Sequence, residues 1–330
     1  YREKVRIFMV WCDEKQSIYM WRGAYPEAFM SIWTRGDFSK KVMTDNYRSC
    51  QQIQNYSNLL CDETRPLYKE VNDLSSVVML CTTTANWVSA VVPYLDKNKR
   101  CALLRYSNAN SEIGAKELTE KGVEFTYVPQ TPISDITTEA AWLYNAIAKH
   151  FILPTYSAYD LRDENPNEVV GNKHILQTIK ISLKHLDEYL KQADKDSFAK
   201  EVEQLANSLG YSTKDEHCKK VYETICDKKF HPAFNIDGLQ RIAITFHSSK
   251  GLEFDQVILF VSDYTLETEQ DICNHYVAAT RAKSKLILVH ISDDGRAAIY
   301  VKNIKKILAE SNLTMRKIAT VVDGINGSKQ

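Results

Sequence analysis

The sequence predicts an α/β fold with a mostly parallel sheet and an inserted helical segment. Seven short apolar runs, several of them rich in β-branched residues, have the composition of strands that are covered on both faces. Stretches with helical periodicity lie between several of these runs, which is typical of parallel strands joined by crossover helices. The region from about 137 to 230 shows helical periodicity and little strand signal.

The strand predictions rest on apolar composition. The predicted strands are Val5–Trp11, Val77–Cys81, Cys101–Tyr106, Glu124–Val128, Arg241–Phe246, Gln256–Ser262 and Lys285–Ile291. Helices are predicted near 53–60, 85–95 and 111–121, and Gly122 ends the third. A basic helix is predicted over Ala297–Ala309, before a tail rich in Gly, Ser and Lys.

The middle region is predicted to be a helical subdomain inserted into the α/β part. Apolar residues recur at helical spacing over 175–190, 198–209 and 216–227. The stretch Tyr156–Asn172 is polar and contains Pro166, so we expect a mobile loop there.

Composition sets limits on function. The 330 residues suffice for two or three packed units. The 42 basic and 42 acidic side chains cancel, so a nucleic-acid contact would need a local groove. Eight cysteines without a CxxC pair indicate reduced thiols and a cytoplasmic protein. No run approaches the ~20 apolar residues of a membrane span, so we expect no membrane partner.

One cluster of His and Cys residues is a candidate metal site. His217, Cys218, Cys226 and His231 lack the tight pairing that is usual in zinc sites. Helix packing is the better interpretation, and no metal ligands are predicted in this chain.

Four motifs carry the functional signal: Asp13–Ala24 (DEKQSIYMWRGA), Asn46–Ser49 (NYRS), Thr245–Glu253 (TFHSSKGLE) and Tyr276–Ala282 (YVAATRA). Asp13 and Glu14 follow an apolar strand, which also fits a pair of acids that holds Mg²⁺ and orients water. These two residues alone do not decide between a Mg²⁺-binding acid pair and the start of a different motif. The string from Gln16 to Ala24 argues against the Mg²⁺-binding pair, because it matches a known helicase motif.

In this order the four motifs resemble the later motifs of UvrD/Rep-like superfamily 1 helicases. The resemblance implies a RecA-like second lobe, with the N-terminal RecA-like lobe largely absent. The implied boundaries are 1–41 (end of the first lobe), 42–136 (second lobe, first part), 137–237 (helical insertion), 238–292 (second lobe, second part) and 293–330 (C-terminal helix and tail). The phosphate-binding pattern GxxxxGK[ST] does not occur in the sequence.

The resemblance also implies an ATP site with Mg²⁺. Gln16 would hydrogen-bond the γ-phosphate, Tyr47 would stack under adenine, and Arg48 would contact the γ-phosphate. Glu253 would accept a ribose hydroxyl, and Arg281 would be the arginine finger that stabilises charge in the transition state. Gln16 and Arg281 are thus the predicted catalytic residues, and all five residues should converge on one triphosphate cleft.

DNA binding is implied for a second set of residues. Trp21 would stack on a base of single-stranded DNA, with Tyr19 nearby and Arg22 on the backbone, because stacking works on any sequence. Thr245 and His247 would lie between nucleotide and DNA. The alternative is that the aromatic residues and His247 are ordinary core or loop residues.

Further strings resemble the helicase-like subunits of Gabija anti-phage defence systems: 54–60, 62–65, 127–133 and 273–281. This resemblance implies a 3′-to-5′ DNA helicase or translocase that responds to single-stranded or end-containing DNA. Its partner would be an OLD-family nuclease subunit in a hetero-oligomer, and DNA-stimulated ATP turnover would regulate that nuclease. Two alternatives remain, a non-translocating sensor that docks a nuclease and a housekeeping repair helicase.

The chain begins at Tyr1 shortly before a predicted strand, so we expect a piece of a longer polypeptide. The Mg²⁺ ligands and the phosphate-binding lysine are expected in the missing lobe. These 330 residues alone are therefore predicted not to hydrolyse ATP.

Overall fold

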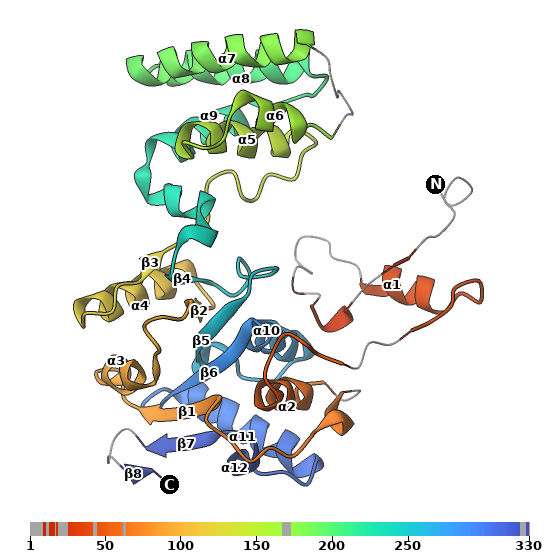
Figure 1. Ribbon diagram of the computed structural model, residues 1–330, viewed down its shortest axis with the longest axis vertical. Helices are drawn as coiled ribbons and strands as arrows, with labels where there is room; N and C mark the ends of the chain where they lie inside the picture. The colour runs from red at the N-terminus through yellow and green to blue at the C-terminus, as the bar shows by residue number, and fades with distance from the viewer. Residues whose placement is uncertain are drawn as a thin grey trace. The chain divides into compact units, whose positions relative to one another are not determined.

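The computed structural model describes residues 9–10, 13–16, 18, 26–41, 45–61, 64–166, 173–323 and 328–329. The chain packs as two units, one formed by residues 1–125 with 240–330 and the other by residues 126–239. The predicted insertion, 137–237, lies within the second unit. Figure 1 shows the α/β architecture of the first unit and the helices of the second, so the predicted fold class is confirmed.

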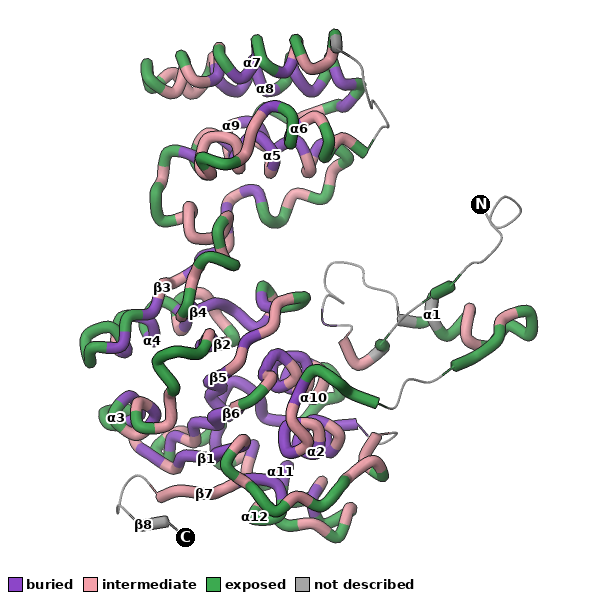
Figure 2. Tube along the Cα trace, viewed as in Figure 1, coloured by how far each residue is buried: buried purple, intermediate pink, exposed green. Residues whose placement is uncertain are grey.

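The first unit is built on a parallel sheet. Its strands are β1 Val77–Thr82, β2 Cys101–Arg105, β4 Arg241–Thr245, β5 Phe254–Phe260, β6 Ala282–Ile291 and β7 Thr320–Asp323. Their order is β4-β2-β5-β6-β1-β7, and every neighbouring pair is parallel. The short β8, Ser328–Lys329, pairs antiparallel with β7, and β3, Thr126–Tyr127, belongs to the second unit. The strands β1, β2, β5 and β6 are mostly buried, which agrees with their mainly apolar sequences (Figure 2).

Helices cover both faces of this sheet (Figure 1). α3 (Trp87–Val91) and α4 (Asn108–Glu120) lie on one face, and α2 (Gln51–Leu59), α10 (Glu269–Ala279) and α11 (Gly295–Glu310) lie on the other. The chain moves in opposite directions along the sheet after β1 and after β5, so right-handed crossovers place the two helix sets on opposite faces. The remaining elements of this unit are α1 Pro26–Trp33, α12 Met315–Ile318, η2 Glu14–Gln16, η4 Arg65–Leu67, η5 Val92–Tyr94 and η8 Val261–Asp263.

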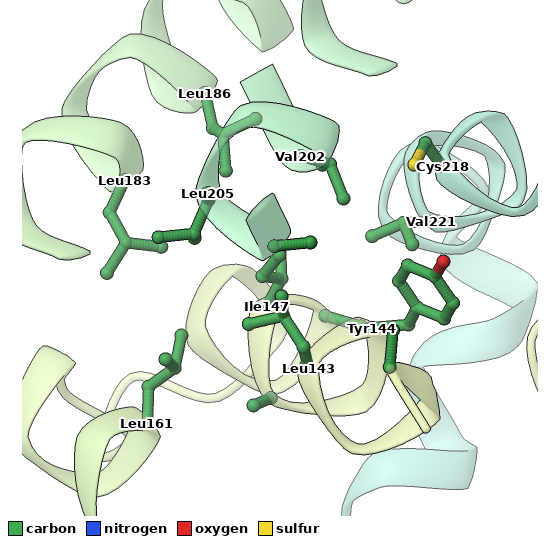
Figure 3. Close-up of a cluster of buried hydrophobic side chains, with 14 of the residues drawn as sticks. Leu143, Tyr144, Ile147, Leu161, Leu183, Leu186, Val202, Leu205, Cys218 and Val221 are labelled. Carbon is green, nitrogen blue, oxygen red and sulfur yellow. The ribbon is translucent and has the colours of Figure 1, made fainter. Parts of the chain in front are cut away.

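The second unit is helical and has its own apolar core (Figure 3). Its elements are α5 Ala141–Ile152, α6 Ala158–Asp163, α7 Lys173–Gln192, α8 Lys195–Ser208, α9 Asp215–Cys226, η6 Lys228–Phe234 and η7 Ile236–Gly238. Ala193 adopts a left-handed conformation (φ 55°) between α7 and α8, and the Asp194 carboxylate caps α8 by accepting from the Ser197 amide at 3.0 Å. Cys218 is buried in this core, as the helix-packing interpretation expects.

Two sequence predictions are wrong in part. The polar stretch after Tyr156 is helical over α6, because Ser157 and Asp160 form a reciprocal capping box. The predicted C-terminal tail contains β7, which pairs with β1 through the register Val78↔Thr320. Apart from residues 9 and 10, the predicted strand Val5–Trp11 lies outside the described residues. In the part of the chain that is described, no helix is both long and apolar enough to span a bilayer.

A buried polar network joins the three helices on one face of the sheet. The hydroxyl of Tyr56 in α2 lies 2.6 Å from Nε2 of His275 in α10 and 2.6 Å from the hydroxyl of Tyr300 in α11. All three side chains are fully buried. Burial lowers the pKa of His275 to about 3, because the charged imidazolium loses its hydration there.

This network predicts a specific loss of stability in acid. An unfolded histidine titrates near pH 6.5, so below that pH the unfolded chain binds a proton that folded His275 rejects until about pH 3. The stability that comes from keeping His275 neutral is fully present above pH 6.5 and is lost as the pH falls toward 3. Between these values we expect the free energy of unfolding to decrease by about 1.4 kcal/mol for each unit by which the pH is lowered.

Urea unfolding at several pH values between about 7.5 and 5 measures this slope. The His275→Gln variant should lose the His275 component of this slope, and His174→Gln, which changes an exposed histidine of α7, is the control substitution. Equal slopes for wild type and His275→Gln would contradict the prediction.

Candidate nucleotide and DNA site

The pairing of β5 with β6 brings two distant charged residues together. Phe254 and Ala282 are register partners, and the Phe254 amide donates to the Arg281 carbonyl at 3.0 Å. Glu253 and Arg281 directly precede these partners. They therefore lie at the same edge of the sheet, at the amino ends of two parallel strands.

Arg48 is tied to the same edge. The Ser49 hydroxyl donates to the carbonyl of Ala282 at 2.7 Å, and the Cys50 amide donates to the Lys283 carbonyl at 2.9 Å. Nε of Arg48 lies 2.6 Å from Oε1 of Glu253. The two side chains are 42% and 41% exposed, so water screens this ion pair and its net stabilisation is small.

Arg281 lies beside this pair but is only 2% exposed. Its Nε donates to the Val277 carbonyl at 3.0 Å, Nη1 to the Leu252 carbonyl at 3.3 Å and Nη2 to Thr280 Oγ1 at 3.2 Å. Burial lowers the pKa of Arg281, the Arg48 charge lowers it further, and Glu253 opposes both effects. A phosphate that reached this guanidinium would have to replace hydrogen bonds to the protein.

Gln16 contacts the loop that leads to Glu253 through its backbone rather than its side chain. Its carbonyl accepts from Nζ of Lys250 at 2.8 Å, while its side-chain Nε2 donates to Oδ2 of Asp13 at 2.7 Å. The hydroxyl of Tyr276 in α10 lies 3.5 Å from the same Asp13 oxygen. Burial raises the pKa of Tyr276, and the Asp13 charge adds to that rise.

Tyr47 differs from the other four residues. Its side chain is 94% exposed, so it does not pack against the charged cluster. The turn that carries it is well defined, because Asn46 Oδ1 accepts from the amides of Arg48 (2.9 Å) and Ser49 (3.2 Å). Of the five residues predicted to converge, the structure brings Arg48, Glu253 and Arg281 together. It places the Gln16 backbone against the loop that leads to Glu253 and leaves the Tyr47 ring in solvent.

The predicted DNA-binding residues are only partly described. Tyr19, Trp21 and Arg22 lie outside the described residues. Thr245 is buried at the end of β4, and its hydroxyl donates to Ser248 Oγ at 3.0 Å. His247 is partly exposed in the turn that follows.

Thr245 and His247 do not join the charged cluster. Strand β2 pairs with both β4 and β5, and its registers align Thr245, the last residue of β4, with Phe260, the last residue of β5. Glu253, in contrast, precedes the first residue of β5. About six strand residues, roughly 20 Å, separate the two levels. The sheet thus presents the charged cluster and the Thr245–His247 turn at opposite ends of its strands.

Sequence reasoning missed two contributors to the cluster. Lys250 and Asp13 fix the Gln16 segment, yet neither was predicted as a site residue. The available signal was their place within the motifs, next to residues that were singled out.

Among the residues that the structure describes, no group of three or more His, Cys, Asp or Glu side chains could hold a metal ion.

Comparison with known proteins gives the family context. Residues 242–289, which include most of β4, all of β5 and most of β6, match the model of the UvrD-like helicase C-terminal domain. The Gabija protein GajB from Bacillus cereus (strain VD045) is 36% identical over 94% of this chain and 62% of its own length. A probable DNA helicase II homolog from Mycoplasma capricolum subsp. capricolum is 24% identical over 86% of this chain and 51% of its own length.

Among solved structures, the C-terminal domain of a possible DNA helicase from Lactobacillus plantarum WCFS1 is 15% identical, with a TM-score of 0.35 over 78% of this chain and 94% of that one. The chain spans between half and two thirds of the length of the curated relatives it matches. The predicted resemblance to UvrD-like helicases is confirmed. Residues 242–289 thus match the model of the UvrD-like helicase C-terminal domain, and the chain is similar over almost all of its length to the Gabija protein GajB.

Proposed function

We propose that this chain supplies one wall of the ATP site in a UvrD-like DNA helicase or translocase of a Gabija-type anti-phage defence system. The observation that carries the proposal is the meeting of Arg48, Glu253 and Arg281, from three separate segments, at one edge of a sheet. Part of that sheet matches the UvrD-like helicase C-terminal domain, and the similarity to GajB supports the role in defence.

The cluster has the chemistry that a nucleoside triphosphate requires. Arginine guanidinium groups match the geometry of phosphate oxygens and keep their charge at neutral pH. Arg48 is held by a single exposed carboxylate, so a triphosphate with several negative charges can compete for it. Glu253 would then be released to accept a hydrogen bond from a ribose hydroxyl. Bound ATP with Mg²⁺ would supply the phosphoryl group, and the metal ligands would come from a first lobe outside this chain.

The remaining residues complete the proposed nucleotide site. The exposed ring of Tyr47 is accessible to a planar adenine, and its well-defined turn limits the entropy lost on binding. Gln16 would turn its amide from Asp13 toward the γ-phosphate. Arg281 would move from its backbone carbonyls to the charge that develops on the transferred phosphoryl group.

DNA would control this ATPase. Single-stranded DNA or DNA ends would bind through Tyr19, Trp21 and Arg22 on one side and Thr245 and His247 on the other. ATP turnover in the cytoplasm would then regulate an OLD-family nuclease subunit in a hetero-oligomer. A housekeeping repair helicase is the second candidate, and the similarity to the DNA helicase II homolog favours it, although at 24% identity against 36% for GajB.

Phosphate release by the full-length protein with and without oligonucleotide tests the proposal. DNA-stimulated turnover that co-purifies with nuclease activity supports the defence role. Displacement of a labelled strand with 3′-to-5′ polarity supports a motor, whereas turnover without displacement supports a sensor. Absence of ATP binding would refute the proposal.

Substitution of the charged cluster should separate binding from turnover. We expect Arg281→Ala to lower kcat by about 10³-fold or more, because an arginine finger acts on charge in the transition state. Tyr47→Ala should mainly raise the KM for ATP, because stacking acts in the ground state as well. Arg35→Ala, which removes an exposed arginine paired with Asp37, is the matched control and should leave both constants unchanged.

Because Arg281 is buried, its removal will also destabilise the fold, by about 1–3 kcal/mol for the unpaired carbonyls. Binding of a fluorescent ATP analogue separates this effect from a loss of catalysis. Wild-type kcat in a folded Arg281→Ala protein would exclude a finger role for this residue.

Trp21→Ala should impair stimulation by DNA. Loss of one stacking contact, ~1–3 kcal/mol, raises the DNA concentration for half-maximal stimulation by about 5- to 150-fold. The rate without DNA should not change. Trp33→Ala in α1 serves as the control tryptophan. If titration with oligo-dT gives the same curve for Trp21→Ala and wild type, the assignment to the base stack is wrong.

A further inference from the structure

An aromatic group lies at the carboxyl ends of β2 and β4, and one of its members, Tyr106, belongs to none of the four motifs. Arg105 and Thr245 are the last register partners of these two strands, and the Phe246 amide donates to the Arg105 carbonyl at 3.0 Å. Tyr106 therefore emerges from the sheet beside Phe246 and His247. All three rings lie at the edge opposite the charged cluster.

The three rings are in contact and differ in exposure. The ring centroids of Tyr106 and Phe246 are 5.4 Å apart with an interplanar angle of 41°, and those of Tyr106 and His247 are 5.9 Å apart and nearly perpendicular. Phe246 is fully buried, whereas Tyr106 is 48% exposed. The Tyr106 ring is thus supported from the protein interior and remains about half open to solvent.

A buried ion pair fixes the backbone of Tyr106. Asp263 Oδ2 accepts from the Tyr106 amide at 3.0 Å and from Arg105 Nε at 2.7 Å, while Oδ1 accepts from Arg105 Nη2 at 3.2 Å. The Arg105 guanidinium also lies 3.8 Å from the ring centroid of Phe260. Tyr106 is therefore anchored at both its backbone and its ring, so binding a flat ligand would cost little conformational entropy.

The surroundings of the ring favour a nucleobase over an aliphatic protein surface. His247 borders it, and the next residue, Ser248, is exposed with its amide and hydroxyl turned to Thr245 Oγ1. The Ser248 groups are bonded within their own turn, and together with His247 they give the ring polar neighbours on this side. A base needs only an accessible π-face, which an exposed and anchored tyrosine offers to any sequence.

We infer that Tyr106, bordered by His247, is a stacking platform for a base of single-stranded DNA. The inference rests on the proposed function, which brings DNA to the neighbouring Thr245 and His247, and it adds a base contact on the second lobe. Tyr106 would contact the base, while Phe246 and Asp263 hold the ring and the backbone of Tyr106 in place.

The test compares two oligonucleotides on the full-length protein, fluorescein-labelled oligo-dT and an abasic strand of equal length, each of about 20 nucleotides, which covers the 4–16 nucleotides of typical single-strand sites. The abasic strand keeps the phosphates and removes the bases. Tyr106→Ala should weaken oligo-dT binding by about 5- to 150-fold and leave abasic binding nearly unchanged. Tyr106→Phe keeps the ring and should bind both strands as wild type does.

Tyr159→Ala is the matched control, because Tyr159 is similarly exposed (51%) but lies in α6 of the helical unit. This variant should bind both strands like wild type. If Tyr106→Ala does not fold, photocrosslinking of wild type to oligonucleotides containing 5-iodouracil gives an independent result. An adduct that maps to Tyr106 supports the inference, and adducts confined to other residues overturn it.

The outcomes separate the two proposals. If wild type binds neither strand, both the proposed function and the platform are refuted. If wild type binds oligo-dT and Tyr106→Ala binds it equally well, only the platform is refuted. The stacking role is also refuted if Tyr106→Ala keeps its DNA affinity but no longer binds a partner nuclease, because the ring would then be a protein contact.

Discussion

Phe254 and Ala282 are register partners in the parallel pair β5–β6, and this alignment decides where the charged residues ahead of both strands can lie. Both strands are buried on their two faces over most of their length, so a slip by one residue would exchange the side chains that pack on each face, and close packing enforces the register. The anchoring of Ser49 to the Ala282 carbonyl depends on the same strand, and it brings Arg48 to Glu253. Core packing therefore sets where Arg48 and Glu253 meet, because their exposed ion pair is too weak to do so.

The two arginines of the cluster are held by forces of different size. An exposed pair such as Arg48–Glu253 contributes about 0–1 kcal/mol, so its partner can be exchanged at little cost. Arg281 is buried and donates three hydrogen bonds, each worth about 1.5–3 kcal/mol when one group is charged. Arg48 is thus free to respond to a ligand, while Arg281 needs a rearrangement of its surroundings. This difference agrees with an early binding role for the first and a late, transition-state role for the second.

The sequence allowed the sheet and the resemblance to UvrD-like helicases to be predicted because both leave local signals. Strands β1, β2, β5 and β6 each contain a run of apolar residues, and the four motifs follow one another along the chain in the order of the helicase family they resemble. β7 was missed because its four residues are only half-buried, and they form a strand by pairing with β1 and β8. α6 had a local signal, the capping box of Ser157 and Asp160, which the polar composition obscured. Tyr106 was missed because an aromatic residue after a strand resembles core, and only its exposure shows otherwise. The individual roles of the nucleotide and DNA residues stay predictions.

The strand order has a consequence for biosynthesis. β1 lies between β6 and β7, and β2 lies between β4 and β5, so all four partners of these strands come later in the chain. During synthesis, both strands leave the ribosome with bare edges and wait while residues 126–239 are made. The helical unit has local contacts and can fold during this interval, whereas the sheet closes only after long-range pairing. A nascent chain of this design is most exposed to aggregation before β4 appears, and chaperone demand should be greatest in that window.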